Sequence, residues 1–70
     1  MPSKLKSYVA IDIAPDGQAL SDAFEAPHDT AAARRAQFAA QGDALQLWRD
    51  AQLIGAWRRT GPRTFERETF

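Results

Sequence analysis

One stretch, residues 44–60 (ALQLWRDAQLIGAWRRT), constrains the fold of this chain more than any other. Two runs rich in large apolar side chains, residues 45–49 and 53–59, flank a polar break at residues 50–52. Short runs of this kind around a polar break are typical of a β-hairpin. The hairpin carries both tryptophans and three of the seven arginines. We therefore expect the core and any binding face to meet in it.

The length of the hairpin loop decides which side chains reach the core. Leu45 and Leu47 share one face, because side chains alternate along a strand. A three-residue loop places Leu53 and Trp57 beside these leucines. A two-residue loop places Ile54 there instead and leaves both tryptophans on the other face. We expect the three-residue loop, because it buries more apolar surface.

Length and composition limit the class of protein. Seventy residues make one domain, and a single core of this size supplies roughly 3 to 5 kcal/mol of net stability. The chain has no cysteine, which suits a reducing compartment. Its first apolar run is short and contains Asp12, so it predicts neither a signal peptide nor a membrane span. We expect a cytoplasmic protein that does not bind membranes.

Charge is balanced in total but uneven along the chain. Nine basic and nine acidic residues cancel, so no global field attracts nucleic acid. Residues 8–33 carry a formal charge of −5, whereas residues 34–70 carry +3. Interleaving of the strands in space would mix these charges. The alternative is that the basic residues gather on one side of the protein and have a function there.

The first part of the chain predicts a hairpin after a flexible arm at residues 1–6. Residues 8–14 alternate and place Val9, Ile11 and Ile13 on one face, which we expect to be the core face. Residues 15–18 (PDGQ) form the turn. The second strand covers residues 19–26, and pairing Ala14 with Ala19 sets Val9 opposite Phe24.

Residues 30–41 predict an alanine-rich helix that either Asp29 or Thr30 caps. We expect Gly42 to end it in the left-handed conformation. The periodicity places Arg35 in the apolar stripe of the helix and Asp22 on the core face of the sheet. We therefore predict that these two charged side chains pair.

These elements predict an α+β fold with the order β-β-α-β-β. We expect a four-stranded antiparallel sheet, built from two hairpins, with one helix packed on one face. The single domain covers residues 7–60. Residues 61–70 form a C-terminal tail or a short edge strand, and we favour the tail because of Pro62 and the mixed charge.

Catalytic and metal-binding patterns do not occur in the sequence. His28 is the only histidine, and one imidazole without a second ligand makes no metal site. The serines have no recognisable base or orienting acid, and the glycines are too far apart to cradle phosphate. We expect a protein that is not an enzyme and that carries no metal and no cofactor.

The sheet face opposite the helix is the predicted binding face. The candidate residues are Tyr8, Asp12, Trp48, Arg49, Ile54, Arg58 and Arg59. An open face with aromatic and apolar side chains predicts a protein partner or a homo-oligomer. The alternative is weak nucleic-acid binding by the tryptophans and arginines of the second hairpin, which stack bases and hold phosphates.

Three short motifs resemble a group of small uncharacterised bacterial proteins with no assigned activity. They are YxxxxxxPDG at residues 8–17, FEAPxDxAAA at residues 24–33 and LWRDxxLIGxWRR at residues 47–59. The resemblance implies the hairpin-helix-hairpin order. The opening YVAIDIAPDG is also similar to the first hairpin of type II antitoxin domains, which implies a sheet-plus-helix fold.

Overall fold

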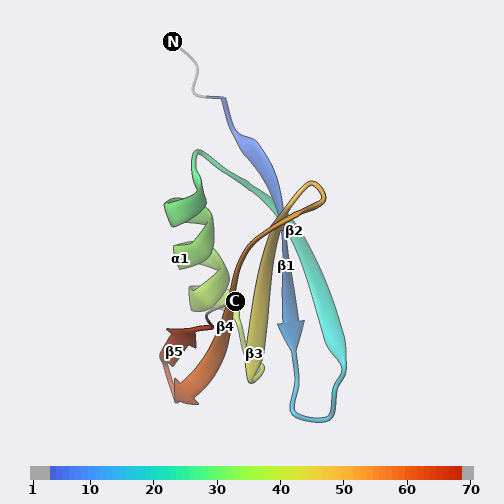
Figure 1. Ribbon diagram of the computed structural model, residues 1–70, viewed down its shortest axis with the longest axis vertical. Helices are drawn as coiled ribbons and strands as arrows, with labels where there is room; N and C mark the ends of the chain where they lie inside the picture. The colour runs from blue at the N-terminus through green and yellow to red at the C-terminus, as the bar shows by residue number, and fades with distance from the viewer. Residues whose placement is uncertain (1–3, 69–70) are drawn as a thin grey trace.

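The computed structural model describes residues 4–68 and has an α+β fold with one helix and a five-stranded antiparallel sheet (Figure 1). The elements are β1 (Lys6–Ile13), β2 (Ala19–Ala26), α1 (Asp29–Ala39), β3 (Ala44–Arg49), β4 (Gln52–Gly61) and β5 (Thr64–Arg67). The strand order across the sheet is β2-β1-β3-β4-β5. Strands β2 and β5 thus form the two edges of the sheet, and β1 and β3, the first strands of the two hairpins, lie side by side.

The sheet has one more strand than predicted. Strand β5 pairs antiparallel with β4 and forms the second edge of the sheet. The C-terminal tail that we favoured for residues 61–70 was therefore wrong at Thr64–Arg67, where the alternative, a short edge strand, is found. A register shift between Arg59 and Gly61 lets the chain turn through Pro62 before it pairs. At the other end, residues 1–3 of the predicted arm lie outside the described residues, and Lys6 already belongs to β1.

A three-residue loop closes the first hairpin. The Ala14 N–H donates to the Gln18 carbonyl (2.8 Å), and the Gly17 N–H donates to the Ala14 carbonyl (2.9 Å). Gly17 has a φ of 90°, which a residue without a Cβ adopts without strain. This loop is one residue shorter than predicted. It therefore sets Tyr8, not Val9, opposite Phe24.

The core face of β1 is the opposite of the predicted one, and the shorter loop agrees with this. Tyr8 is 1% exposed and its ring stacks on that of Phe24, with centroids 5.9 Å apart. Val9 is 37% exposed on the other face. The helix presents small side chains to the sheet, among them the buried Ala32 and Ala36, so large rings are needed to fill the space beneath it.

The second hairpin combines a two-residue loop with a β-bulge. Arg49 pairs with Gln52 across a loop whose Asp50 has a φ of 55°, a conformation that Asp tolerates. The register then shifts, so that Ile54 is an extra residue in β4. Trp57 consequently lies beside Leu45 in the core, as predicted, whereas Leu53 pairs with Trp48 on the opposite face and not with the leucines.

Both ends of α1 are held by side chains that differ from the predicted ones. His28 is the N-cap, and its Nδ1 accepts a hydrogen bond from the Ala31 N–H (3.1 Å). After the helix, the Asp12 carboxylate accepts hydrogen bonds from the N–H groups of Gln41 and Gly42 (2.8 Å each). Gly42 is not left-handed. It is needed because a Cβ there would collide with the Ile13 carbonyl oxygen.

Candidate interaction surfaces

The seven residues predicted as one binding face are divided between the two faces of the sheet. Trp48 and Arg58 lie on the face away from α1, which we call the open face. The other five lie on the side of the helix, which we call the helix face: Tyr8, Asp12, Arg49, Ile54 and Arg59. The structure therefore does not bring the seven together, because the first-hairpin register and the bulge in β4 differ from the predicted ones.

Tyr8, Asp29 and Arg49 form a polar cluster where β1, β3 and the first turn of α1 meet. The Tyr8 hydroxyl donates to Asp29 Oδ1 (2.6 Å), and Arg49 Nη1 donates to the same oxygen (2.9 Å). Burial and then the hydrogen bond to Asp29 raise the pKa of the Tyr8 hydroxyl above 10.0. The hydrogen bond from Tyr8, assisted by the charge of Arg49, lowers the pKa of the Asp29 carboxyl below 3.8. The cluster ties the helix to the sheet and engages Nη1 of Arg49.

Arg59 holds the other end of the helix. Its Nη2 donates to the carbonyl of Ala40 (2.9 Å) and its Nε to that of Gly42 (2.8 Å), while Nη1 donates to the Pro62 carbonyl (2.6 Å). The guanidinium carbon also lies 4.5 Å from the centre of the Phe65 ring. These contacts satisfy carbonyl groups at a helix end, where a positive charge is favourable.

The open face has an uncharged, mostly apolar centre. Three cross-strand rows cover it: Ala23, Val9, Trp48 and Leu53 in the first; Ser21, Ile11, Gln46 and Ala56 in the second; Ala19, Ile13, Ala44 and Arg58 in the third. The Trp48 Nε1–H donates to Gln46 Oε1 (3.0 Å), so the two polar groups near the middle satisfy each other. Within residues 4–68, no helix covers this face.

Strand β2 is a free edge of the sheet, and half of its backbone groups point outward. Bonded and non-bonded pairs alternate along an antiparallel ladder, and Ala14 with Gln18 is a bonded pair. The N–H and C=O groups of four residues therefore face away from β1: Ala19, Ser21, Ala23 and Glu25. This edge offers unpaired backbone groups for strand pairing, and the side chains of the same four residues lie on the open face.

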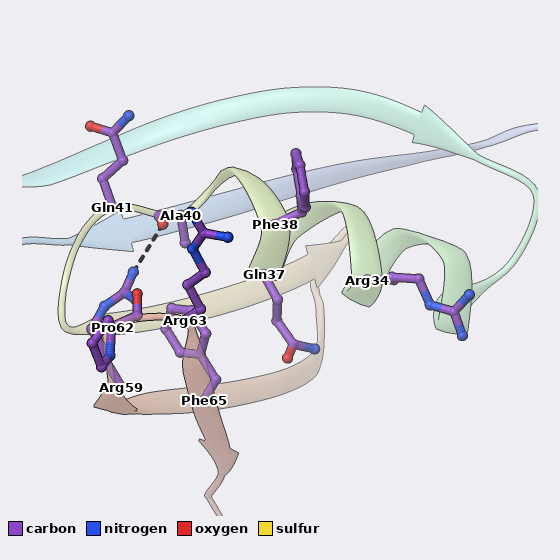
Figure 2. Close-up of a pocket in the computed structure, with 9 residues that line it drawn as sticks. All are labelled: Arg34, Gln37, Phe38, Ala40, Gln41, Arg59, Pro62, Arg63 and Phe65. Atoms are coloured by element: carbon purple, nitrogen blue, oxygen red, sulfur yellow. Dashed lines mark hydrogen bonds between the residues drawn. The ribbon is translucent and has the colours of Figure 1, made fainter.

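A groove runs between α1 and the hairpin of β4 and β5, with a volume of about 760 Å³ (Figure 2). Its main side chains are Arg34, Gln37 and Phe38 from the helix and Arg59, Arg63 and Phe65 from the hairpin. A second hollow of about 450 Å³ shares Arg34 and Gln37 with it and continues along the helix to Trp57 and Arg67. We call the two hollows together the arginine groove.

Six of the seven arginines lie on the helix side of the molecule. They are Arg34, Arg35, Arg49, Arg59, Arg63 and Arg67. Arg35 does not pair with Asp22 within the described chain; its guanidinium carbon lies 4.8 Å from the centre of the Phe24 ring. The predicted pair was wrong because an aromatic face lay closer to the arginine. Most of the arginines thus lie on one side of the sheet, which also carries Asp12, Asp22 and Asp29.

Among residues 4–68, no group of three or more His, Asp or Glu side chains could hold a metal ion. In the same part of the chain, α1 is too short and too polar to cross a membrane. The surfaces described above are therefore the features from which a function can be argued.

Sequence reasoning missed the outward position of Val9, Ile11 and Ile13 and the groove beside the helix. The tripeptide Pro15-Asp16-Gly17 was the usable signal for the first, because a turn that ends in a left-handed glycine favours a three-residue hairpin loop. Nothing comparable in the sequence places Arg63 near Arg34, which depends on how β5 folds back. Comparisons with protein-family models, curated proteins and solved structures found no match to this chain, so both resemblances stay predictions.

Proposed function

We propose that the protein is a small interaction domain that self-associates through the open face of its sheet. The observation that carries the proposal is the set of apolar side chains left uncovered on the two central strands β1 and β3. Val9, Ile11, Ile13 and Trp48 belong to it, and Val9 is 37% exposed. An apolar patch of this kind on so small a domain is typical of an interface.

The charges around this face favour a second copy as the occupant. Glu25 lies at one end of the edge strand β2, opposite Ser7, and Arg58 lies at the other end of the sheet in β4, opposite Ala44. Glu25 and Arg58 thus lie at opposite corners of the open face. If two open faces pack with a two-fold axis along the diagonal between the other two corners, Glu25 of one copy lies near Arg58 of its partner, and the reverse. The strands of the two sheets then cross at a large angle, which is one of the two preferred sheet packings.

The size of the face also suits a dimer. A standard interface buries about 800 Å² on each partner. The chain exposes 5227 Å², so such an interface takes roughly 15% of its surface. Aromatic anchors at the centre of an interface contribute most of its affinity, and Trp48 lies in the first of the three rows.

Sedimentation velocity from micromolar to submillimolar concentration tests the proposal. We expect a concentration-dependent dimer, which Ile11→Lys disrupts because it places a charge at the centre of the interface. The matched control is Leu20→Lys, which places the same charge on the helix face, at a side chain that is 73% exposed, and should leave the dimer intact. A protein that stays monomeric throughout, or a dimer that Leu20→Lys breaks and Ile11→Lys does not, would refute the open face as the interface.

A further inference from the structure

The arginine groove has features that self-association through the open face does not use. It lies on the opposite side of the sheet, between α1 and the β4–β5 hairpin. Figure 2 shows Arg34 projecting from the helix, and Arg59 beneath the helix end with its hydrogen bond to Ala40. Four arginines contribute to the groove, counting Arg63 and Arg67.

The groove is uniformly basic over most of its length. The side chains that line its larger hollow include no acid. Asp29 lines the far end, and its carboxylate already accepts hydrogen bonds from Tyr8 and Arg49. Among residues 4–68, Arg34 and Arg63 form no ion pair. Both guanidinium groups are therefore free to hold anionic groups, and they come from separate elements, which suits an extended anion better than a single small one.

An aromatic side chain stands beside these arginines. Phe38 lines the groove and is 93% exposed, the highest exposure among the large apolar side chains of the described chain. Its ring makes no contribution to the core cluster. A base or another flat group can stack on an aromatic ring that is open to water. The neighbouring Gln37 and Gln41 offer amide groups that donate and accept hydrogen bonds.

We propose that the arginine groove binds a short stretch of single-stranded nucleic acid. Arg34 and Arg63 contact phosphates, Phe38 stacks on a base, and Arg59 adds its charge from a fixed position. A basic groove with an exposed aromatic ring is the arrangement by which proteins hold single strands without reading sequence. An acidic peptide would match the charge but would leave the Phe38 ring without a specific partner.

This site differs from the one predicted from the second hairpin. That site comprised Trp48, Arg49, Arg58 and Arg59. The structure leaves Arg58 on the same face as Trp48 but places Arg49 and Arg59 on the helix face. Arg49 is bonded to Asp29. The arginine groove takes its free cations from α1 and from the turn between β4 and β5 instead.

Fluorescence anisotropy of labelled oligo-dT and oligo-rU, each about ten nucleotides long, tests the proposal at low salt. We expect both probes to bind and the affinity to fall as salt rises, because phosphate contacts release counterions. The double variant Arg34→Gln/Arg63→Gln should weaken binding about tenfold or more and lower the salt slope by about 1.4, two contacts at about 0.7 each. Phe38→Ala should weaken binding at least about fivefold without loss of the fold, because the ring is exposed.

Arg58→Gln is the matched control, because it removes the same charge from the opposite face and should bind like the parent protein. Binding of only one of the two probes retains the site and assigns it to DNA or to RNA. The proposal fails if neither probe binds at low salt, or if Arg58→Gln weakens binding as much as the double variant. It fails in favour of an acidic peptide if labelled oligo-glutamate binds as tightly as the nucleotides and Phe38→Ala changes neither.

Discussion

The two faces of this sheet are built from the same strands yet differ in how their side chains are satisfied. On the helix face, four polar side chains beside the core have partners: Tyr8 and Arg49 bond to Asp29, and Asp12 and Arg59 bond to the backbone after the helix. No buried side-chain polar atom in the described chain lacks a hydrogen bond. On the open face, the side chains at the centre are mostly aliphatic and only partly covered.

The difference follows from what a single short helix needs. A helix leaves backbone groups unpaired at both ends, so the face beneath it must supply polar side chains as well as apolar ones. The open face has no such groups to satisfy. Substitutions on the helix face should therefore affect folding, and substitutions on the open face should affect association.

The largest expected effect comes from truncating the centre of the core. Leu47 is 0% exposed, so Leu47→Ala should destabilise the fold by about 3 kcal/mol. Ile11→Ala, one strand away on the open face, should cost about 1 kcal/mol or less in the monomer. Urea unfolding at a protein concentration below that of self-association measures both. Equal losses for the two variants would remove the distinction between the faces.

Two arginines that are neighbours in β4 provide a sharper comparison, because they differ in face but not in chemistry. Arg59→Ala removes several hydrogen bonds to the carbonyls after α1 and should cost about 2 kcal/mol. Arg58→Ala removes one long ion pair to Glu68 (3.9 Å) from an exposed side chain and should change stability by about 0.5 kcal/mol or less. Thermal unfolding of the two variants gives the answer. A larger loss for Arg58 than for Arg59 would contradict the assigned faces.

The polar cluster predicts a smaller effect with a defined dependence on pH. Because the pKa of Asp29 is lowered on folding, its stabilising contribution is present above pH 3.8 and is lost as pH falls through the folded pKa. Because the pKa of Tyr8 is raised, its contribution is present below pH 10.0 and is lost as pH rises through the folded pKa. Tyr8→Phe should cost about 1 to 2 kcal/mol at neutral pH.

Unfolding curves from acid to alkaline pH test this, with tyrosinate absorbance as a direct readout, since Tyr8 is the only tyrosine. In the Tyr8→Phe variant, the part of the stability loss at alkaline pH that is caused by ionisation of this hydroxyl should be absent. A Tyr8 that ionises below pH 10.0 in the folded protein would show that the hydroxyl is not held against Asp29.

Local signals predicted the elements well, because each depends on residues that are close in sequence. The alanine-rich run gave the helix, and the proline and glycine of residues 15–17 gave the first turn. Which side chains of two paired strands share a face depends on the exact length of the loop between them. A shift of one residue in the pairing moves every side chain of one strand to the opposite face. Neither the three-residue loop at residues 15–17 nor the bulge at Ile54 leaves a strong hydrophobic pattern, so the face of Val9 in the first hairpin and that of Leu53 in the second were assigned incorrectly.

The candidate site was less predictable than the fold. Trp48 reached the open face because it alternates with the buried Leu45 and Leu47 in β3, and Arg58 did so because it follows the buried Trp57 in β4. The position of Arg59 beneath the helix end is a tertiary contact with Ala40 that no local pattern encodes. No local pattern encodes the arginine groove either, because its two sides come from α1 and from the β4–β5 hairpin.

The two tryptophans allow the most direct test of the account, because one lies on each face. Both can be labelled with 5-fluorotryptophan and followed by fluorine NMR over a series of protein concentrations, with Trp48→Phe to assign the two signals. The account predicts that the Trp48 signal shifts as the concentration rises, while the signal of Trp57, which is 7% exposed in the core, does not move. Two signals that are both independent of concentration, or a shift confined to Trp57, would contradict association through the open face.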